Sequence, residues 1–378
     1  MKIVHISTGL DIGGAEIMLE RLLTLHPEHR GELVVISLQD VGPIGSRLRK
    51  HGFNVITMNM VGKLGFPMAL WRLVRLLKQL KPDLVQTWMY HADLLGGVAA
   101  RLAGVPCVVW GIHCSRLPLG RPLTKIVMKA CSYLSSVVPD AIVAVAEEAK
   151  KNHIAYGYQP DKFHVIPNGF IPGVKFEMSA VEQLKNSLGL HESGRVLGSV
   201  GRYHPDKGQD ILVQALALLP RDVSWQCVLV GKGCDEQNSE LSAALKQYDL
   251  AERVKLLGLR EDVQLLLQCF DVFCLPSRSE AFPMALGEAM SVGLTCVATD
   301  VGDCAELVGE TGFVVAAHSA PVLAEALSKT LTMSQAQLRQ LGDMARQRVL
   351  QHFDLRVVSQ SYMQLYLELT DTLKKMSE

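Results

Sequence analysis

Short apolar runs alternate with helix-patterned segments along the first part of the chain. The runs lie at Ile3–Ile6, Leu33–Leu38, Asn54–Thr57, Leu84–Trp88, Cys107–Ile112 and Ala141–Val145. Such alternation is typical of strands joined by crossover helices. It predicts an α/β domain with a parallel sheet covered by helices on both faces.

The same alternation restarts after residue 195. Its apolar runs lie at Val196–Val200, Gln226–Val230, Val254–Leu257, Asp271–Leu275, Thr295–Ala298 and Phe313–Val315. Between the two series lies IPNGFIPG, residues 166–173, where two prolines and two glycines interrupt the pattern. We therefore expect two doubly wound domains, residues 1–173 and 174–354, and a last helix from about Leu355 to Lys375.

Length and composition agree with a two-domain globular protein. The 378 residues suffice for two hydrophobic cores, and no apolar run reaches membrane-spanning length without interruption. Nine cysteines are scattered singly without a Cys-x-x-Cys pair, which is typical of reduced, buried thiols. These features favour a cytoplasmic location.

Charge is divided unevenly between the two halves. Residues 1–172 hold 19 Lys and Arg against 12 Asp and Glu, and the remainder holds 19 against 26. A net charge of +7 on the first half can attract an anionic membrane surface or a phosphorylated acceptor. We expect no nucleic-acid partner.

Two carboxylates flank the start of one expected helix. Pro276–Ser279 breaks the strand that ends at Leu275, and Pro283, a residue suited to a first helical position, precedes a helix from about Met284 to Ser291. Glu280 lies just before this helix and Glu288 lies inside it. The free N–H groups of a helix start favour an anion such as a phosphate, whereas the spacing alone also fits ordinary surface glutamates.

The wider sequence resembles a known family. SRSEAFPMALGEAM, followed by VATDVGDCAELV, closely resembles the Glu-x7-Glu signature of family-4 glycosyltransferases, which have the GT-B fold. This resemblance implies that Glu280 faces the donor sugar and that Glu288 holds the ribose of the nucleotide. The family usually has Gly after the first Glu, and this chain has Ala281, which would resist a positive φ. The resemblance also implies that the last helix, residues 355–378, packs on the first domain.

Glycines and cations add to the expected donor site. Gly13 and Gly14 lie between the first strand and the first helix, where the family binds the donor diphosphate. Arg202 and Lys207 match the family's Gly-Arg-x4-Lys-Gly pattern, and two such cations can hold a diphosphate. The backbone from Phe282 to Leu286 completes the expected donor contacts. Phe282, Met284, Ala285 and Leu286 each carry an N–H group there, and Pro283 has none.

Two histidines follow strands of the first domain. His113 stands after CVVWGI, at the carboxyl end of a strand, where open parallel sheets bind ligands. It resembles the family's histidine beside the reacting sugar, so we expect His113 to be a catalytic residue together with Glu280. His91, in TWMYHADLLGG, is a candidate for acceptor contact.

Two segments mix basic and apolar residues. In Trp71–Lys81 and in Arg116–Lys129 either a membrane-facing helix or an ordinary surface helix fits the pattern. For the second segment the residues that would meet anionic lipid are Arg121, Lys125 and Lys129.

The resemblance implies a retaining glycosyltransferase with its active site in the cleft between the domains. It would move a hexose or N-acetylhexosamine from a UDP- or GDP-sugar to an acceptor hydroxyl, with the leaving phosphate helping to take the proton. The expected acceptor is a lipid-linked glycan of lipopolysaccharide, capsule or exopolysaccharide assembly, on the cytoplasmic face of the inner membrane. The chain has no Asp-x-Asp, so we expect no metal and no other cofactor, with the cations supplying the positive charge.

Other functions share parts of this pattern. A small soluble acceptor is an alternative to a lipid-linked one. A non-hydrolysing sugar-nucleotide epimerase would turn over the donor without an acceptor, and a glycosyl phosphorylase or sucrose-synthase type enzyme uses the same fold. A nucleotide-sugar binding protein would bind the donor and transfer nothing.

Overall fold

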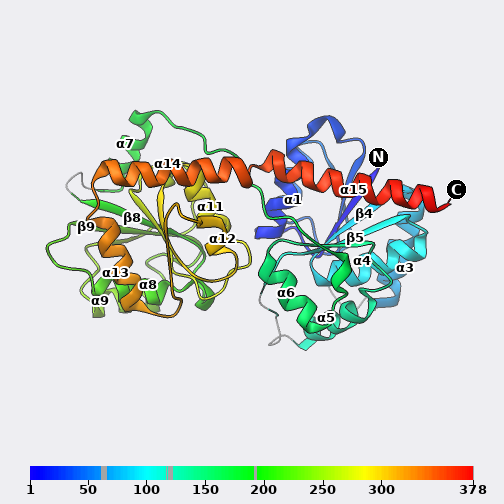
Figure 1. The fold of residues 1–378 in the computed structure, drawn as a ribbon, viewed down its shortest axis with the longest axis horizontal. Helices are drawn as coiled ribbons and strands as arrows, with labels where there is room; N and C mark the ends of the chain where they lie inside the picture. Colours follow the sequence, from blue (N-terminus) through cyan, green and yellow to red (C-terminus); the bar gives the residue numbers. More distant parts are fainter. Residues whose placement is uncertain (61–65, 116, 118–121, 191–193, 378) are drawn as a thin grey trace. The chain divides into compact units, whose positions relative to one another are not determined.

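The computed structural model describes the chain except residues 61–65, 116, 118–121, 191–193 and 378 (Figure 1). The chain forms two compact units. The first contains Met1–Gly169 and Leu355–Glu378, and the second contains Phe170–Asp354. The division falls before Phe170 and not after Gly173, because Phe170 contacts two residues of the second unit. Its N–H donates to the Phe353 carbonyl at 2.8 Å, and its ring centroid lies 5.9 Å from that of Phe282.

The first unit is built on a seven-stranded parallel sheet in the order β3-β2-β1-β4-β5-β6-β7. The strands are β1 Ile3–Ser7, β2 Leu33–Ser37, β3 Asn54–Thr57, β4 Leu84–Trp88, β5 Cys107–Ile112, β6 Ala141–Ala144 and β7 Phe163–Val165. Six of them were expected from the sequence. The short edge strand β7, with its exposed His164, has too little apolar character to stand out.

Helices cover both faces of this sheet. They are α1 Gly14–Leu25, α2 Gly42–Lys50, α3 Phe66–Leu80, α4 Tyr90–Ala103, α5 Pro122–Leu134, α6 Glu147–Tyr156 and α15 Leu355–Ser377. Helices α1, α2 and α15 share one core with the sheet, while α3 and α5 pack on either side of α4 (Figure 1). In α3 the buried stripe holds Leu73 and Leu77, and Arg72, Arg75 and Lys78 point to solvent.

Helix α15 is part of the first unit, as the resemblance implied. Tyr362 and Tyr366 are buried in the core of that unit, and the Tyr366 hydroxyl donates to Gln86 Oε1 at 3.1 Å. A buried phenol that finds a strand side chain fixes the position of the helix on the sheet. The first unit is therefore completed by the last segment of the chain.

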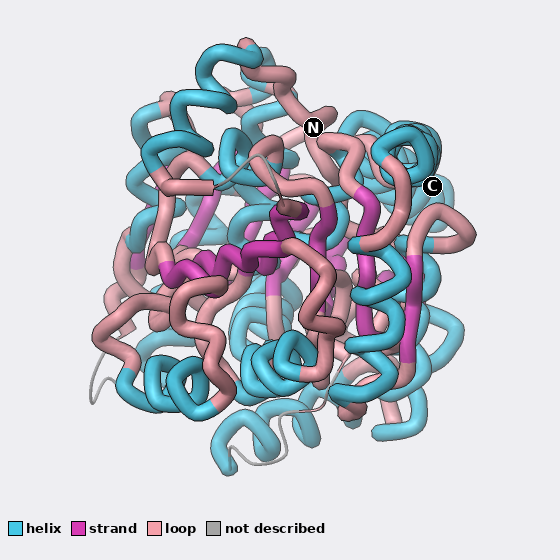
Figure 2. The backbone as a smooth tube through the Cα atoms, turned by 90° about the vertical axis from the view of Figure 1, so that its left-hand side faces the viewer, coloured by secondary structure: helices cyan, strands magenta, loops and turns pink. Residues whose placement is uncertain are grey.

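The second unit is built on a six-stranded parallel sheet in the order β10-β9-β8-β11-β12-β13. The strands are β8 Arg195–Val200, β9 Trp225–Val230, β10 Val254–Leu256, β11 Val272–Leu275, β12 Thr295–Thr299 and β13 Phe313–Val315. Its helices are α7 Met178–Ser187, α8 Gln209–Ala217, α9 Ser239–Gln247, α10 Val263–Leu267, α11 Met284–Ser291, α12 Cys304–Val308, α13 Ala320–Leu331 and α14 Gln335–His352. Figure 2 shows strands enclosed between helices, so both units have the layered α/β architecture that the sequence predicts.

Helix α11 has the expected bounds, but Pro283 has a different place in it. The helix begins at Met284, and Pro283 is the N-cap residue with φ −80° and ψ 94°. This ψ is extended, so Pro283 lies outside the helix instead of at its first position. Its carbonyl oxygen still accepts the first helical hydrogen bond, from Gly287 N–H at 3.2 Å.

Candidate active site

The loops of the second unit that carry the expected donor residues leave neighbouring strands. Strands β8 and β11 pair in the middle of the sheet, and the chain runs outward from them in opposite directions through β9 and β10 and through β12 and β13. At such a switch point the two loops diverge and leave a crevice at the carboxyl ends of the strands, where open α/β sheets bind ligands. Arg202 and Lys207 lie on the loop after β8, and Glu280 lies on the loop after β11.

Glu280 is held by two partners. Lys207 Nζ lies 2.7 Å from Glu280 Oε1 and 2.9 Å from Oε2, so the ammonium spans both carboxylate oxygens. The Ser277 hydroxyl donates to Oε1 at 2.7 Å. The Glu280 side chain is only 9% exposed, against 27% for Lys207, so this ion pair is sheltered and its charge-assisted bonds are strong. The structure thus brings the expected sugar-facing carboxylate and one expected phosphate-binding cation together.

The two loops are also joined through their backbones. The Arg278 N–H donates to the Asp206 carbonyl at 2.7 Å. Gly208 has φ +65°, and a Cβ at this position would lie 2.1 Å from the Pro276 carbonyl oxygen. Only glycine fits such an approach, and the contact fixes Lys207 relative to the strand end that precedes Glu280.

Arg202 is less constrained than Lys207. Its side chain is exposed, while its carbonyl oxygen accepts from Gln209 Nε2 at 2.9 Å. Arg202 forms no ion pair with a described residue, so its exposed guanidinium can turn toward an arriving anion while its backbone stays anchored. The geometry therefore leaves Arg202 available to a phosphate.

Ala281 fits its loop without strain. It does not adopt a positive φ, whereas Gly302 on the facing loop has φ +56° and a Cβ there would meet the Glu280 and Ala281 carbonyl oxygens at 2.5 Å. Asp303 N–H donates to the Ala281 carbonyl at 3.0 Å. The methyl group that departs from the family pattern is therefore tolerated, because the glycine conformation belongs to the facing loop.

Aromatic packing supports the start of α11. The Phe282 side chain is 5% exposed, with ring centroids 5.9 Å from Phe170 and 5.6 Å from Phe353. This side chain belongs to the core, so only its backbone can face a ligand. Glu288 is the fifth residue of the helix, about one turn after its start, and is partly buried.

In the first unit the corresponding switch point lies between β1 and β4. Gly13 is the N-cap of α1 and Gly14 is its first residue, as expected for an anion site at a helix start. A Cβ on Gly13 would lie 2.4 Å from Glu16 Oε2, so a carboxylate already faces these glycines. Burial raises the pKa of Glu16, which eases its protonation if a second anion arrives.

His113 follows β5 and stacks on Trp88, with ring centroids 4.8 Å apart and planes inclined by 20°. Neither ring nitrogen of His113 has a hydrogen-bond partner among the described residues. Burial lowers the pKa of His113 to about 4, so the ring is neutral at pH 7. A neutral imidazole with unused nitrogens can bind a hydroxyl group as donor or acceptor.

The weaker candidates are placed on the surface of the first unit. His91 is the second residue of α4 and is exposed at the surface. Neighbouring groups exclude part of the water around its ring, which lowers its pKa. Lys125 and Lys129 are exposed on α5, and Lys129 Nζ lies 4.6 Å from the ring centroid of Tyr133. Arg121 lies outside the described residues.

Three residues beside the candidate residues were not expected from the sequence: Ser277 beside Glu280 in the second unit, and Trp88 and Tyr90 beside His113 and Cys114 in the first. Ser277 is fully buried and positions Glu280, yet a serine in a turn is an ordinary turn residue. Trp88 and Tyr90 flank Met89, which has φ +75° and ψ 157°, a conformation favourable mainly for glycine. No local pattern reveals that backbone, because methionine is not a residue that signals it.

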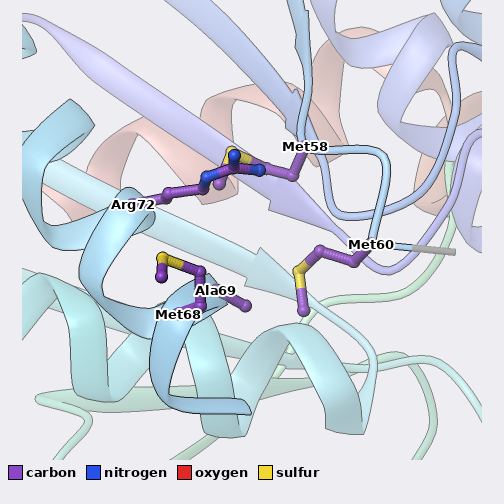
Figure 3. Close-up of a pocket in the computed structure, with 5 residues that line it drawn as sticks. All are labelled: Met58, Met60, Met68, Ala69 and Arg72. Atoms are coloured by element: carbon purple, nitrogen blue, oxygen red, sulfur yellow. The ribbon is translucent and has the colours of Figure 1, made fainter. Parts of the chain in front are cut away.

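A small methionine-lined pocket lies apart from these residues, beside the end of β3. Met58 and Met60 follow the strand, and Met68, Ala69 and Arg72 come from the first part of α3 (Figure 3). Within the described chain, no group of three or more His, Cys, Asp or Glu is placed to hold a metal ion.

Two family models match the chain. The model described as Glycosyltransferase Family 4 matches residues 12–172, and the one described as Glycosyl transferases group 1 matches residues 194–333. Together they span the sequence on both sides of the unit boundary, including Gly13, His113, Lys207 and Glu280.

Individual relatives agree with these models. The chain is 32% identical over 242 residues to the UDP-Gal:α-D-GlcNAc-diphosphoundecaprenol α-1,3-galactosyltransferase of Escherichia coli, covering 62% of each chain. It is 29% identical over 267 residues to the 2-deoxystreptamine glucosyltransferase of Streptomyces kanamyceticus, covering 64% of this chain and 66% of that enzyme. The chain thus matches slightly less than two thirds of the length of each.

A solved structure, that of Anabaena HepE in complex with UDP, matches 97% of this chain and all of that chain, with a TM-score of 0.87 and 25% identity. HepE has also been solved in complex with UDP-glucose, with a TM-score of 0.83 and 26% identity, over 99% of this chain and all of that one. The fold and the site thus define a GT-B protein with two Rossmann-like units. The two family models and the fold together identify a glycosyltransferase of the GT-B fold.

Proposed function

We propose that the protein transfers a sugar from a nucleoside-diphosphate donor to an acceptor hydroxyl with retention of configuration. The observation that carries this proposal is the contact of Lys207 with both oxygens of the sheltered Glu280 at the β8–β11 switch point. This arrangement puts a hydrogen-bond acceptor for sugar hydroxyls next to a cation for the leaving phosphate. An epimerase or a binding protein would not need an acceptor, and the tests below separate them.

The donor diphosphate would lie against Arg202, Lys207 and the start of α11. As the bond between the sugar C1 and the phosphate oxygen breaks, negative charge grows on the diphosphate, and fixed cations stabilise it more in the transition state than in the ground state. In this proposal the two cations supply the charge that a metal supplies elsewhere, so no metal is required. Glu288 would hold the ribose hydroxyls.

Glu280 would orient the sugar, and His113 would bind a hydroxyl group of a substrate. The acceptor oxygen attacks C1 on the face that the diphosphate leaves, and the leaving phosphate oxygen takes the acceptor proton. One C–O bond forms as another breaks, which yields the glycoside and the free nucleoside diphosphate. The neutral state of His113 at pH 7 suits a hydrogen bond to a sugar hydroxyl.

We propose a UDP-sugar carrying a hexose or an N-acetylhexosamine as the donor, with a GDP-sugar as the second candidate. The UDP and UDP-glucose complexes of HepE and the UDP-Gal in the name of the E. coli relative support this choice.

We propose a lipid-linked glycan as the acceptor, as in polysaccharide or lipopolysaccharide assembly. The diphosphoundecaprenol acceptor of the E. coli relative and the basic first half of the chain support it. A small soluble acceptor is the second candidate, because the S. kanamyceticus relative is named for 2-deoxystreptamine.

Helix α5 would contact the membrane on which such an acceptor resides. It exposes Leu123, Ile126 and Tyr133 together with Lys125 and Lys129, a combination suited to an anionic lipid surface. No helix among the described residues is both long and apolar enough to cross a bilayer. Replacing Lys125 and Lys129 by Gln should weaken binding to anionic vesicles, while Lys151→Gln on α6 should not. Equal binding by both variants would remove the membrane contact.

Donor binding tests the proposal first. Thermal unfolding would be followed with a panel of UDP- and GDP-sugars for the wild type, Arg202→Ala and Arg221→Ala. Arg221 is an exposed residue before the amino end of β9, away from the carboxyl ends of the strands. One donor should stabilise the wild type and Arg221→Ala, because a ligand that binds only the folded state raises its stability, and should stabilise Arg202→Ala much less. A stabilised Arg202→Ala would remove that residue from the donor site.

A further inference from the structure

The Tyr90 phenol lies at a junction between three segments of the first unit. Tyr90 is the first residue of α4 and is only 2% exposed. It comes between Met89, whose backbone adopts the strained conformation described above, and His91.

Two hydrogen bonds hold the phenol. Its oxygen lies 2.7 Å from His153 Nε2 on α6 and 2.9 Å from Cys114 Sγ, directly after His113. His153 Nδ1 lies 2.6 Å from the Ala149 carbonyl oxygen. A carbonyl can only accept, so Nδ1 carries the proton and Nε2 accepts.

The direction of the chain of hydrogen bonds follows. Since His153 Nε2 accepts, the Tyr90 O–H donates to it, and the phenol oxygen is left to accept from the Cys114 S–H. Burial raises the pKa of Cys114 to about 11 and lowers that of His153 to about 4, which keeps the thiol protonated and the imidazole neutral at pH 7. The Cys114 thiol therefore donates to the Tyr90 oxygen, and the Tyr90 hydroxyl donates to His153 Nε2.

Further contacts act in the same direction. Asn152 Nδ2 on α6 donates to the Ser115 carbonyl at 3.1 Å, and Met89 N–H donates to the Gly111 carbonyl at 2.9 Å. The segments that carry His91 and His113 are thus tied to each other and to α6. His113 has no hydrogen bond of its own to a described residue, so its place depends on these neighbours and on its stacking with Trp88.

We propose that Tyr90 is a positioning residue: by bonding Cys114 and His153 it sets the places of His91 and His113 at the carboxyl edge of the sheet. The effect on transfer rests on the proposed function, whereas the effect on the position of the histidines does not. The strained backbone at Met89 fits this role, because strain persists where the surrounding contacts over-determine a segment.

Tyr90→Phe tests the proposal in the full-length protein, with Tyr158→Phe as the matched control. Tyr158 is equally buried, and its ring lies 5.3 Å from that of His153, but its hydroxyl makes no hydrogen bond to His153 or Cys114. Two readouts are needed: the ring resonances of the histidines by NMR, and kcat with donor affinity measured separately. The NMR readout requires no reaction.

Tyr90→Phe should shift or broaden the His113 resonances and lower kcat by about tenfold or more, since small misplacements of a reacting group are costly. Donor affinity should stay within about twofold, because most donor contacts belong to the second unit. Tyr158→Phe should change neither readout. Cys114→Ser should keep kcat near that of the wild type, since a hydroxyl also donates, while Cys114→Ala should lower it.

Unchanged His113 resonances in Tyr90→Phe would overturn the proposal whatever the enzyme does. Shifted resonances with an undiminished kcat would also overturn it, because the positions would not matter for the reaction. A wild type that turns over no donor, with His113 resonances that still respond to Tyr90→Phe and not to Tyr158→Phe, would support the positioning and instead contradict the proposed function.

Discussion

At the scale of single residues, the orientation of the Glu280 carboxylate depends on Lys207 and Ser277. Lys207 neutralises its charge, but Lys207 must also meet the phosphate, so the Ser277 hydroxyl is the partner that can hold the carboxylate throughout a reaction. Ser277 is itself fixed, since its carbonyl accepts from the Thr299 hydroxyl at 2.6 Å. The carboxylate is therefore oriented from the protein side as well as by the cation.

Ser277→Ala should lower stability by about 1–2 kcal/mol, because it removes one hydrogen bond to a charged, sheltered group. It should also lower kcat more than it weakens donor binding. Urea unfolding and steady-state kinetics measure the two effects. Ser279→Ala is the control, because it removes a hydroxyl from the same loop that makes no hydrogen bond to the described Glu280 carboxylate. Equal effects of both variants would remove the assigned role.

Asp93 gives the first unit a pH dependence. It is fully buried and accepts from the Thr87 hydroxyl at 2.6 Å, and burial raises its pKa to about 7. The folded state then holds the proton more tightly than the unfolded state, so the stabilisation is complete below about pH 4 and is lost as the pH rises through 7. Urea unfolding of the wild type should show this decline, and Asp93→Asn should flatten it. An identical slope in both would contradict the assignment.

The sequence was informative about residues that match the family's motifs. The spacing of the Glu pair, the Gly pair and the cations alone also fits ordinary turn and surface residues, so the resemblance singled them out, and the structure places Lys207 against Glu280. Residues such as Ser277, Tyr90 and His153 look like ordinary turn or core positions. Their contacts arise between segments far apart in the chain, which local patterns do not encode.

At the scale of elements, the two loops of the second unit depend on a glycine. Gly208→Ala adds a Cβ that meets the Pro276 carbonyl and must also adopt φ +65°. Gly189→Ala is the control, because Gly189 has φ +58° but only Lys255 Nζ nearby, at 3.6 Å.

The free energy of unfolding of Gly189→Ala should fall by about 1–2 kcal/mol, because alanine must adopt a left-handed backbone there. Gly208→Ala should lose at least about 1 kcal/mol more, because the clash involves backbone, and it should weaken donor binding. Denaturant unfolding with and without the stabilising donor measures both. Equal losses in the two variants would mean that the loops do not meet as closely as described.

The elements themselves were largely predictable. Twelve of the thirteen strands follow from apolar runs, and the helix Met284–Ser291 follows from its flanking turn and proline. The exceptions have physical reasons: β7 is a three-residue edge strand with an exposed centre, and Pro283 keeps an extended ψ. The unit boundary differs from the expected one because Phe170 packs against Phe282, a contact across more than a hundred positions.

At the scale of the whole molecule, the chain closes the first unit with its last helix. Ending the chain at Asp354 would remove Tyr362 and Tyr366 from the core and leave Gln86 without its phenol partner. Amide exchange should then lose protection in β1, β4 and β5 and keep it in β8, β11 and β12. Uniform loss in both units would show that their folding is coupled.

The most direct measurement of the central claim is slow hydrolysis of the donor in EDTA without acceptor, for the wild type, Glu280→Gln and Glu325→Gln, an exposed carboxylate on α13. The wild type and Glu325→Gln should release nucleotide from one UDP- or GDP-sugar at equal rates. Glu280→Gln should be slower by about 10²-fold, because it loses a charged group that orients the sugar. An undiminished rate in Glu280→Gln, loss of all activity in EDTA, or release of an epimerised donor would contradict a metal-independent glycosyltransferase centred on Glu280.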